Sequence, residues 1–212
     1  MNKAMVVGLM ALASYGAGGG QGAETAGYQI TVHLQNPPTA DPLLLAGAKA
    51  LATSMFAGIG VHLRWEGSGL RRARGRQTVP DAEIVIGFDS NAPAGFHPGA
   101  PAYSRPYAPQ SKVRVTIFYD RVVKLVEKDR LSDRAAFLGH VLAHEIGHVL
   151  QGAAGHSEAG IMKAQFTPED RAQMRRGPLP FSALDAKLIQ RAMAKGRSAV
   201  EIAAGEVEIA PR

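Results

Sequence analysis

The segment SDRAAFLGHVLAHEIGHVLQ, residues 132–151, has the pattern of one long helix. Ser132 is a favoured residue for capping the start of a helix, and apolar residues then recur with helical spacing. Gly152 follows, and glycine readily adopts the left-handed conformation that ends helices. At 3.6 residues per turn, the segment predicts a helix of about five turns.

The middle of this helix carries the motif HEIGH, residues 144–148. Its two histidines, His144 and His148, stand four residues apart and therefore lie on one helical face, about 6 Å apart along the axis. Such a pair can bind one tetrahedral zinc ion. Glu145 can accept a proton from a water molecule beside the metal without binding the ion itself. A chance match on a buried helix is the alternative, because short motifs also occur without function.

The residues that follow, VLQGAAGHSEAGIM at 149–162, make the segment resemble the metzincin clan of zinc peptidases. The resemblance implies that His156 is the third zinc ligand and that Met162 forms an apolar floor beneath the metal. In the clan pattern the third histidine comes six residues after the second, whereas His156 comes eight after His148. Gly152 and Gly155 can supply the positive backbone angles that a longer turn needs. An ordinary core methionine is the alternative for Met162, since methionine fills gaps in many cores.

The resemblance also implies a fold and an activity. The fold is an α+β, metzincin-like zincin with a twisted mixed sheet of about four to five strands, an active-site helix and a C-terminal helix. The activity is that of a zinc metalloendopeptidase with one catalytic Zn²⁺, in which Glu145 is the general base acting on a peptide or protein substrate. Some metzincins have a tyrosine after the methionine turn, but residues 163–166 read KAQF. A zinc-binding recognition module without catalysis and a zinc amidase acting on cell-wall peptides remain as alternatives.

The other histidines are weaker candidates. His140 lies on the same helical face as His144, but it is about 12 Å along the axis from His148, too far to share an ion. We expect it to support the site from outside the ligand set or to pack at the surface. His33, His62 and His97 have no partner at metal-binding spacing, and His97 stands out only because its position is in a loop.

Composition limits the chemistry further. The 212 residues are 46% hydrophobic and include no cysteine, so a metal here needs histidine or carboxylate ligands. The size suits one domain, which we place at residues 27–197 with a C-terminal tail at 198–212. The formal net charge is +6, and four arginines between positions 71 and 76 contribute to it without interleaved aromatic residues. We therefore expect a solvated loop there and no nucleic-acid partner.

The N-terminus has the features of an export signal. Lys3 precedes an apolar run at 4–13, which is too short to span a bilayer and is followed by small residues. We predict a signal peptide at residues 1–23, cut somewhere between positions 13 and 26, and a monomeric protein that is secreted or periplasmic and has no stable membrane anchor. A frayed apolar helix on a cytoplasmic protein is the alternative.

The remaining pattern predicts how the domain is built. Strands are expected at four places: residues 28–34, 61–65, 83–88 and 113–119. A helix at 41–57 would connect the first two strands. The proline-rich stretch 89–112 reads as a long loop with a short edge strand near Ala102 and Tyr103. Thr167 and Pro168 mark a helix start, and a last amphipathic helix at 182–195 is expected to bury four residues: Leu184, Leu188, Ile189 and Met193.

Overall fold

The computed structural model describes six stretches of the chain: residues 27–35, 42–66, 82–90, 99–105, 114–127 and 130–207. The predicted export signal, the arginine-rich stretch at 71–76 and His97 lie outside these residues. Among the helices that the structure describes, none is both long enough and apolar enough to cross a membrane.

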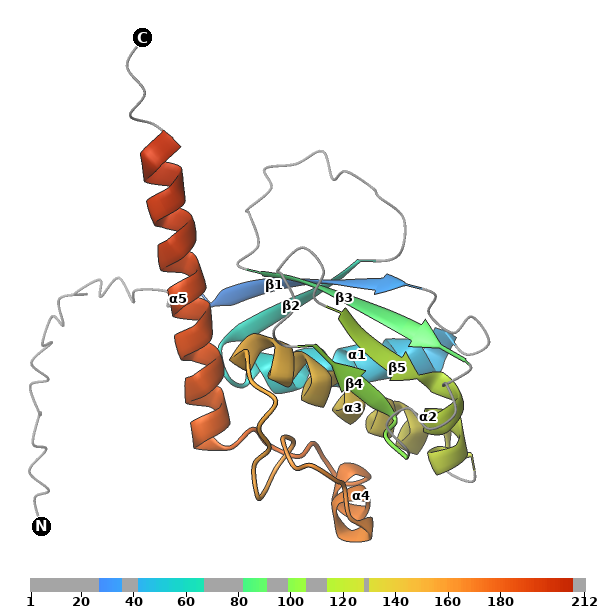
Figure 1. Cartoon of the computed structure of the whole chain (residues 1–212). Coiled ribbons are helices and arrows are strands. Elements are labelled where there is room, and N and C mark those ends of the chain that lie inside the picture. The colour runs from blue at the N-terminus through green and yellow to red at the C-terminus, as the bar shows by residue number, and fades with distance from the viewer. Residues whose placement is uncertain are drawn as a thin grey trace, which may run out of the picture.

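Five strands form one mixed sheet with the order β2-β1-β3-β5-β4 (Figure 1). The strands are β1 (Tyr28–Gln35), β2 (Val61–Glu66), β3 (Ala82–Asp89), β4 (Ala102–Ser104) and β5 (Arg114–Phe118). The first three and β5 run parallel, whereas β4 pairs antiparallel with β5 and forms one edge. The predicted mixed sheet of about four to five strands is therefore confirmed, and it is mostly parallel.

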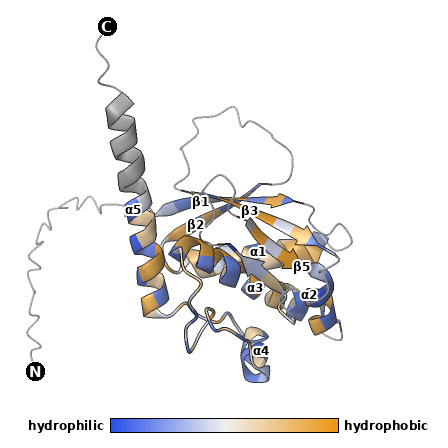
Figure 2. Ribbon diagram, viewed as in Figure 1, coloured by the Kyte–Doolittle hydropathy of each residue, from blue (hydrophilic) through white to orange (hydrophobic). Residues whose placement is uncertain are grey.

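Alternating burial explains how these strands sit on the core. In β3, Ile84, Ile86 and Phe88 are buried, and the residues between them are more exposed. Successive side chains of a strand point to opposite faces, so one face of the sheet is apolar. Helix α1 (Pro42–Ala57) connects β1 to β2 and packs against helix α3 (Leu131–Gln151), and both lie along the same side of the sheet in Figure 1. In Figure 2, hydrophobic residues, coloured orange, are prominent in the strands of the sheet.

The long helix α3 begins one residue earlier than predicted. Arg130 precedes its first turn in extended conformation without a side-chain cap, and its carbonyl accepts the N–H groups of Asp133 and Arg134. The prediction that Ser132 caps this helix is therefore wrong. At the other end Gly152 has φ 62° and donates its N–H to the Val149 carbonyl, as predicted for the left-handed stop.

A short helix that the sequence pattern missed follows β5. Helix α2 (Tyr119–Val126) begins where a strand was expected to continue. Val122 and Val126, one turn apart, are its buried residues. β-Branched valines favour strands, so the residue types there conceal the helical spacing.

Two helices complete the domain. Helix α4 (Pro168–Met174) starts as predicted: Thr167 and Asp170 form a reciprocal capping box with Pro168 in the first turn. Helix α5 (Ala183–Val207) is longer than predicted and packs against α3.

Of the four residues of α5 that were predicted to be buried, two are buried and two are exposed. Ile189 and Met193 are buried, whereas Leu184 is 64% exposed and Leu188 is 40% exposed. The buried stripe begins instead at Asp185, which is only 2% exposed. Residues 185, 189 and 193 are four apart and so share one face of the helix.

Candidate metal centre

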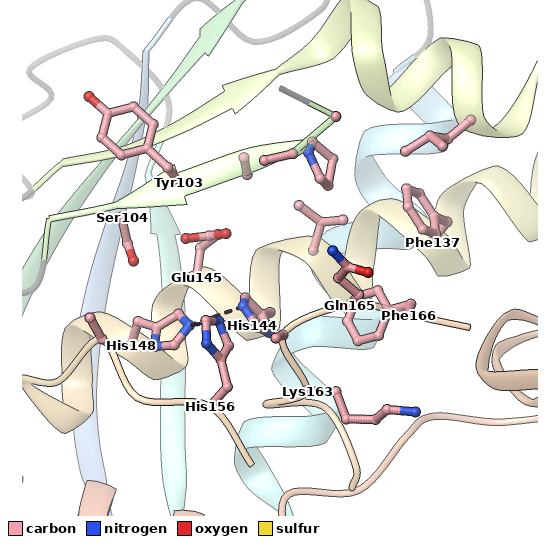
Figure 3. Close-up of a pocket in the computed structure, with 18 of the residues that line it drawn as sticks. Tyr103, Ser104, Phe137, His144, Glu145, His148, His156, Lys163, Gln165 and Phe166 are labelled. Carbon is pink, nitrogen blue, oxygen red and sulfur yellow. Dashed lines mark hydrogen bonds between the residues drawn. The ribbon is translucent and has the colours of Figure 1, made fainter. Parts of the chain in front are cut away.

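Helix α3 presents His144 and His148 on the face that opens into a cavity (Figure 3). Their ring centroids are 4.6 Å apart, and their Nε2 atoms are 3.0 Å apart. Four residues of a helix rise about 6 Å, so the rings tilt toward each other to bring these nitrogens together. The predicted convergence of the two imidazoles is thus present in the structure.

The loop after α3 brings His156 to the same point. Its Nε2 atom lies 3.2 Å from Nε2 of His148, and its ring stacks at 5.4 Å from the ring of His144. The three histidines offer ligand atoms that all lie within 4.8 Å of one another. They are therefore able to hold a metal ion together.

Hydrogen bonds at the far side of the rings determine where the protons are. Nδ1 of His144 donates to the Ile161 carbonyl at 2.8 Å, and Nδ1 of His148 donates to the Ala153 carbonyl at 3.0 Å. A carbonyl can only accept, so each neutral ring carries its proton on Nδ1 and leaves a lone pair on Nε2. Two unprotonated nitrogens that face one another have no hydrogen bond between them, and both lone pairs are available to one metal ion.

The spacing of these nitrogens suits zinc. Two imidazoles bound to a tetrahedral zinc ion at 2.0–2.1 Å have ligand atoms about 3.3 Å apart. The separations of 3.0 Å and 3.2 Å around His148 are close to this value. With three protein ligands, a tetrahedral ion keeps one open position, as a catalytic site requires.

Burial keeps the two helical histidines neutral. Burial lowers the pKa of His144 to about 4, and the hydrogen bond to Ile161 opposes this shift only in part. Burial likewise lowers the pKa of His148. Both rings are therefore available as metal ligands near neutral pH without first losing a proton.

Glu145 lies in the cavity beside this cluster but outside the set of three ligands. It is 6% exposed, and burial raises its pKa to about 7, while a hydrogen bond from the Ser104 side chain acts in the opposite direction. A carboxyl group with such a pKa can both take and return a proton near neutrality. In Figure 3 its carboxyl group points into the space between the histidines and β4.

The cavity around the site has a volume of about 520 Å³. One wall is residues 99–104, which include edge strand β4, and the opposite wall is the segment 163–166 after Met162. Apolar side chains also line the cavity: Leu125, Phe137, Val141 and Phe166. An extended chain thus has room between two walls, one of which offers strand edges for pairing.

Met162 is fully buried beneath α3. A Cβ atom added to Gly147 would lie 2.7 Å from the Met162 sulfur, so this glycine, between the two ligands, lets the methionine approach the helix. This close packing suits a core methionine as well as an apolar floor, so the role given by the resemblance stays a prediction.

The turn that carries His156 uses different glycines from those expected. Gly152 has φ 62°, as predicted, but Gly155 does not have a positive φ. The second positive angle belongs to Gly160, with φ 77°. A Cβ at Gly160 would lie 2.4 Å from the Pro180 carbonyl oxygen, so the close approach of these two segments requires glycine.

His140 does not lie at the surface, which was one of the two roles predicted for it. It is fully buried, its Nδ1 donates to the Ala136 carbonyl at 2.6 Å, and its Nε2 accepts the Leu179 N–H at 3.0 Å. It therefore connects α3 to the segment before α5 and does not contact the ligands. His33 lies instead on the sheet beside two acidic residues, Glu66 and Glu83.

Sequence reasoning missed two polar residues near the site. Ser104, on β4, forms a hydrogen bond with the side chain of Glu145. Asp185, at the start of α5, accepts a hydrogen bond from the hydroxyl of Ser157. Ser104 follows Ala102 and Tyr103, the predicted edge strand, which is the only local signal for it. Asp185 follows Ser182 by three residues, the spacing of a capping pair.

Comparisons with known proteins add little to this picture. No family model and no curated protein matches the sequence. Among solved structures the chain is similar to archaemetzincin from Methanopyrus kandleri, with 13% identity and a TM-score of 0.45 over 81% of this chain and 98% of that one. A likeness of this size assigns neither ligand nor activity.

Proposed function

We propose that this protein is a zinc-dependent endopeptidase whose metal is held by His144, His148 and His156. The observation that carries the proposal is the convergence of imidazole nitrogens beside a buried carboxyl group in an open cavity. A binding-only metal site has no need of Glu145 at that point. Zinc, when bound, polarises the scissile carbonyl and makes a coordinated water acidic near neutral pH.

Glu145 carries the proton in the proposed reaction. Its carboxylate accepts a proton from the attacking water and then donates it to the amine that leaves, so no covalent intermediate with the protein is needed. Ionisation of Glu145 is favoured beside a dication, which offsets the effect of its burial. The hydroxyl of Ser104 stabilises that ionised form by donating to it.

The walls of the cavity support a polypeptide as the substrate. Strand β4 is the outer strand of the sheet among the described residues and also lines the cavity, so an extended chain can lie alongside it. The apolar side chains of Phe137 and Phe166 suit the side chains of such a substrate. A peptide bond positioned between β4 and the histidines lies within reach of Glu145.

The proposal is tested by the Glu145→Gln variant together with a broad peptide library, with and without a chelator. The amide keeps the size of the side chain but cannot accept the proton, so zinc content and fold should be unchanged. Hydrolysis should fall by roughly 10² to 10⁴, about 3 to 5 kcal/mol of barrier. Glu83→Gln, at a glutamate that is 63% exposed on β3, is the matched control and should cleave normally.

Two outcomes would contradict the proposal. If the folded, zinc-loaded wild type cleaved no peptide, the metal site would belong to a recognition module. If Glu145→Gln and the wild type cleaved at equal rates, the base would be another residue.

A further inference from the structure

The third histidine is held differently from the other two. Nδ1 of His144 and Nδ1 of His148 are each fixed by a backbone carbonyl. His156 is exposed, and its ring makes a polar contact through Nε2 only, with no partner for Nδ1 among the described residues. Histidine ligands ordinarily donate the second ring nitrogen to an acceptor that fixes the ring. The orientation of His156 therefore depends on its backbone.

The residue after His156 is tied at two points. The N–H of Ser157 donates to the Met162 carbonyl at 2.8 Å, and its hydroxyl donates to Oδ1 of Asp185 at 2.7 Å. The first bond closes the loop on itself. The second connects the loop to helix α5, 28 residues further along the chain.

The two oxygen atoms of the Asp185 carboxylate accept hydrogen bonds from different segments of the chain. Oδ2 accepts the N–H of Ser182 at 3.1 Å and its hydroxyl at 2.6 Å, which caps the start of α5. Oδ1 accepts the Ser157 hydroxyl and, at 3.3 Å, the side-chain amide of Gln151 at the end of α3. Asp185 is 2% exposed, and these donors offset the loss of water around its charge.

A second capping box in the same chain shows what helix capping alone requires. Asp170 of α4 uses Oδ2 to accept the N–H of Thr167 and the amine of Lys163. No bond to the ligand loop is needed there. The contact of Oδ1 of Asp185 with Ser157 is thus additional to its role as a cap.

We propose that Asp185, acting through Ser157, is the positioning residue that holds His156 in place as a metal ligand. The inference rests on the proposed metal site. It explains how His156, an exposed residue on a loop, can be held in a fixed orientation like the two ligands on the helix.

The test is the affinity for zinc, measured by competition with a chromophoric chelator at neutral pH. Loss of a group that orients a ligand weakens metal binding about 10- to 100-fold, so we expect Ser157→Ala and Asp185→Asn to fall in this range. Ser157→Thr keeps the hydroxyl and should bind as the wild type does. Asp170→Asn, the matched control in the other capping box, should also leave the affinity unchanged.

A double-variant cycle separates positioning from general destabilisation. In the background of His156→Ala, the change Ser157→Ala should weaken zinc binding no further, because the ligand that it positions is already gone. The visible absorption of the cobalt-substituted protein should report the same altered coordination in Ser157→Ala as in His156→Ala. Ser157→Ala is the main variant because its side chain lies outside the core, whereas Asp185→Asn changes a helix cap as well.

Equal zinc affinity in Ser157→Ala and the wild type would overturn this proposal, and so would an equal loss in both backgrounds. Neither result would affect the proposed peptidase. A wild type that bound no zinc would instead overturn both proposals. A wild type that bound zinc through three histidines but cleaved nothing would overturn the peptidase alone.

Discussion

The two halves of the metal centre are built by different means. On α3, the helical repeat itself places His144 and His148 together, and each ring is locked by a carbonyl of the following loop. On the loop, His156 is exposed and depends on the anchoring of its neighbour Ser157. The helix therefore fixes two ligands by local geometry, and the third is fixed by a contact between segments far apart in sequence.

This difference sets the expected sensitivity of each half to substitution. Because His144 and His148 are buried, protonation of either ring is unfavourable, and we expect substitution of either residue to have a large effect. We expect single changes in the loop that carries His156 to have smaller effects, because three features together fix its conformation: the helix cap at Gly152, the turn at Gly160 and the hydrogen bond from Ser157 to Asp185.

The largest effect is expected from the ligands themselves. His144→Ala and His148→Ala should each abolish stoichiometric zinc, a loss on the order of 10³ in affinity, about 4 kcal/mol or more. His156→Ala should weaken binding strongly but less, because the helical pair remains. Metal analysis by mass spectrometry of the purified variants measures this, with His33→Ala on the sheet as control. Unchanged zinc affinity in His156→Ala would contradict the three-ligand site.

The next effect is a pH dependence carried by Glu145. Its pKa is raised from 4.5 to about 7 in the fold, so above pH 4.5 the unfolded chain loses a proton that the folded protein keeps. This carboxyl group therefore lowers stability progressively as the pH rises from about 4.5 to 7. In the metal-free protein, the free energy of unfolding of Glu145→Gln should exceed that of the wild type increasingly over this pH range, by up to about 3 kcal/mol.

Urea unfolding in the presence of chelator, at several pH values, measures that difference. The pKa of His144 is lowered from 6.5 to about 4 in the fold, so His144 lowers the stability of the protein as the pH falls from 6.5 to 4. This effect is present in both proteins and cancels in the difference. Parallel stability curves for the two proteins would show that Glu145 is not protonated in the fold.

A smaller effect is expected at His140, which is buried on the ligand helix α3, one turn before His144, but is not a ligand. His140→Ala should lower the free energy of unfolding by about 2 kcal/mol, because the Leu179 N–H loses its buried acceptor. Zinc content should stay at the level of the wild type. Urea unfolding and metal analysis of the same sample decide this, and a loss of zinc with stability intact would place His140 at the metal after all.

The smallest effect compares two glycines of the ligand loop. Gly160→Ala should cost about 1 to 2 kcal/mol, because φ is 77° there and the Pro180 carbonyl blocks a side chain. Gly155→Ala should change stability by less than about 0.5 kcal/mol, since its φ is not positive and nothing lies within 4 Å of its Cβ position. Thermal unfolding of the two variants measures the difference, and equal effects would mean that the turn is not set by Gly160.

The sequence was most informative where structure depends on local spacing. The motif at residues 144–148, the stop at Gly152 and the start at Pro168 each follow from a pattern of a few residues, and the structure has all three. The parallel pairing of β1 and β2 follows as well, because a helix between two strands brings the second back in the same direction.

Contacts between distant segments were beyond such reasoning. The acceptor role of His140 depends on Leu179, 39 residues away. Leu184 and Leu188 form an apolar stripe on α5, but the face that packs inward is the one that carries Asp185, because its carboxylate receives donors from Gln151 and Ser157. A hydrophobic pattern assigns a charged residue to the outside, so it selects the wrong stripe here.

X-ray absorption spectroscopy at the zinc edge tests the central claim most directly. On wild-type protein loaded with one equivalent of zinc, we expect three imidazole nitrogens at about 2.0–2.1 Å and one further light ligand at the open position. The His156→Ala protein should show one imidazole fewer. A wild-type spectrum with two imidazoles or fewer, or a spectrum unchanged by His156→Ala, would contradict a centre built from the helix pair and the loop histidine.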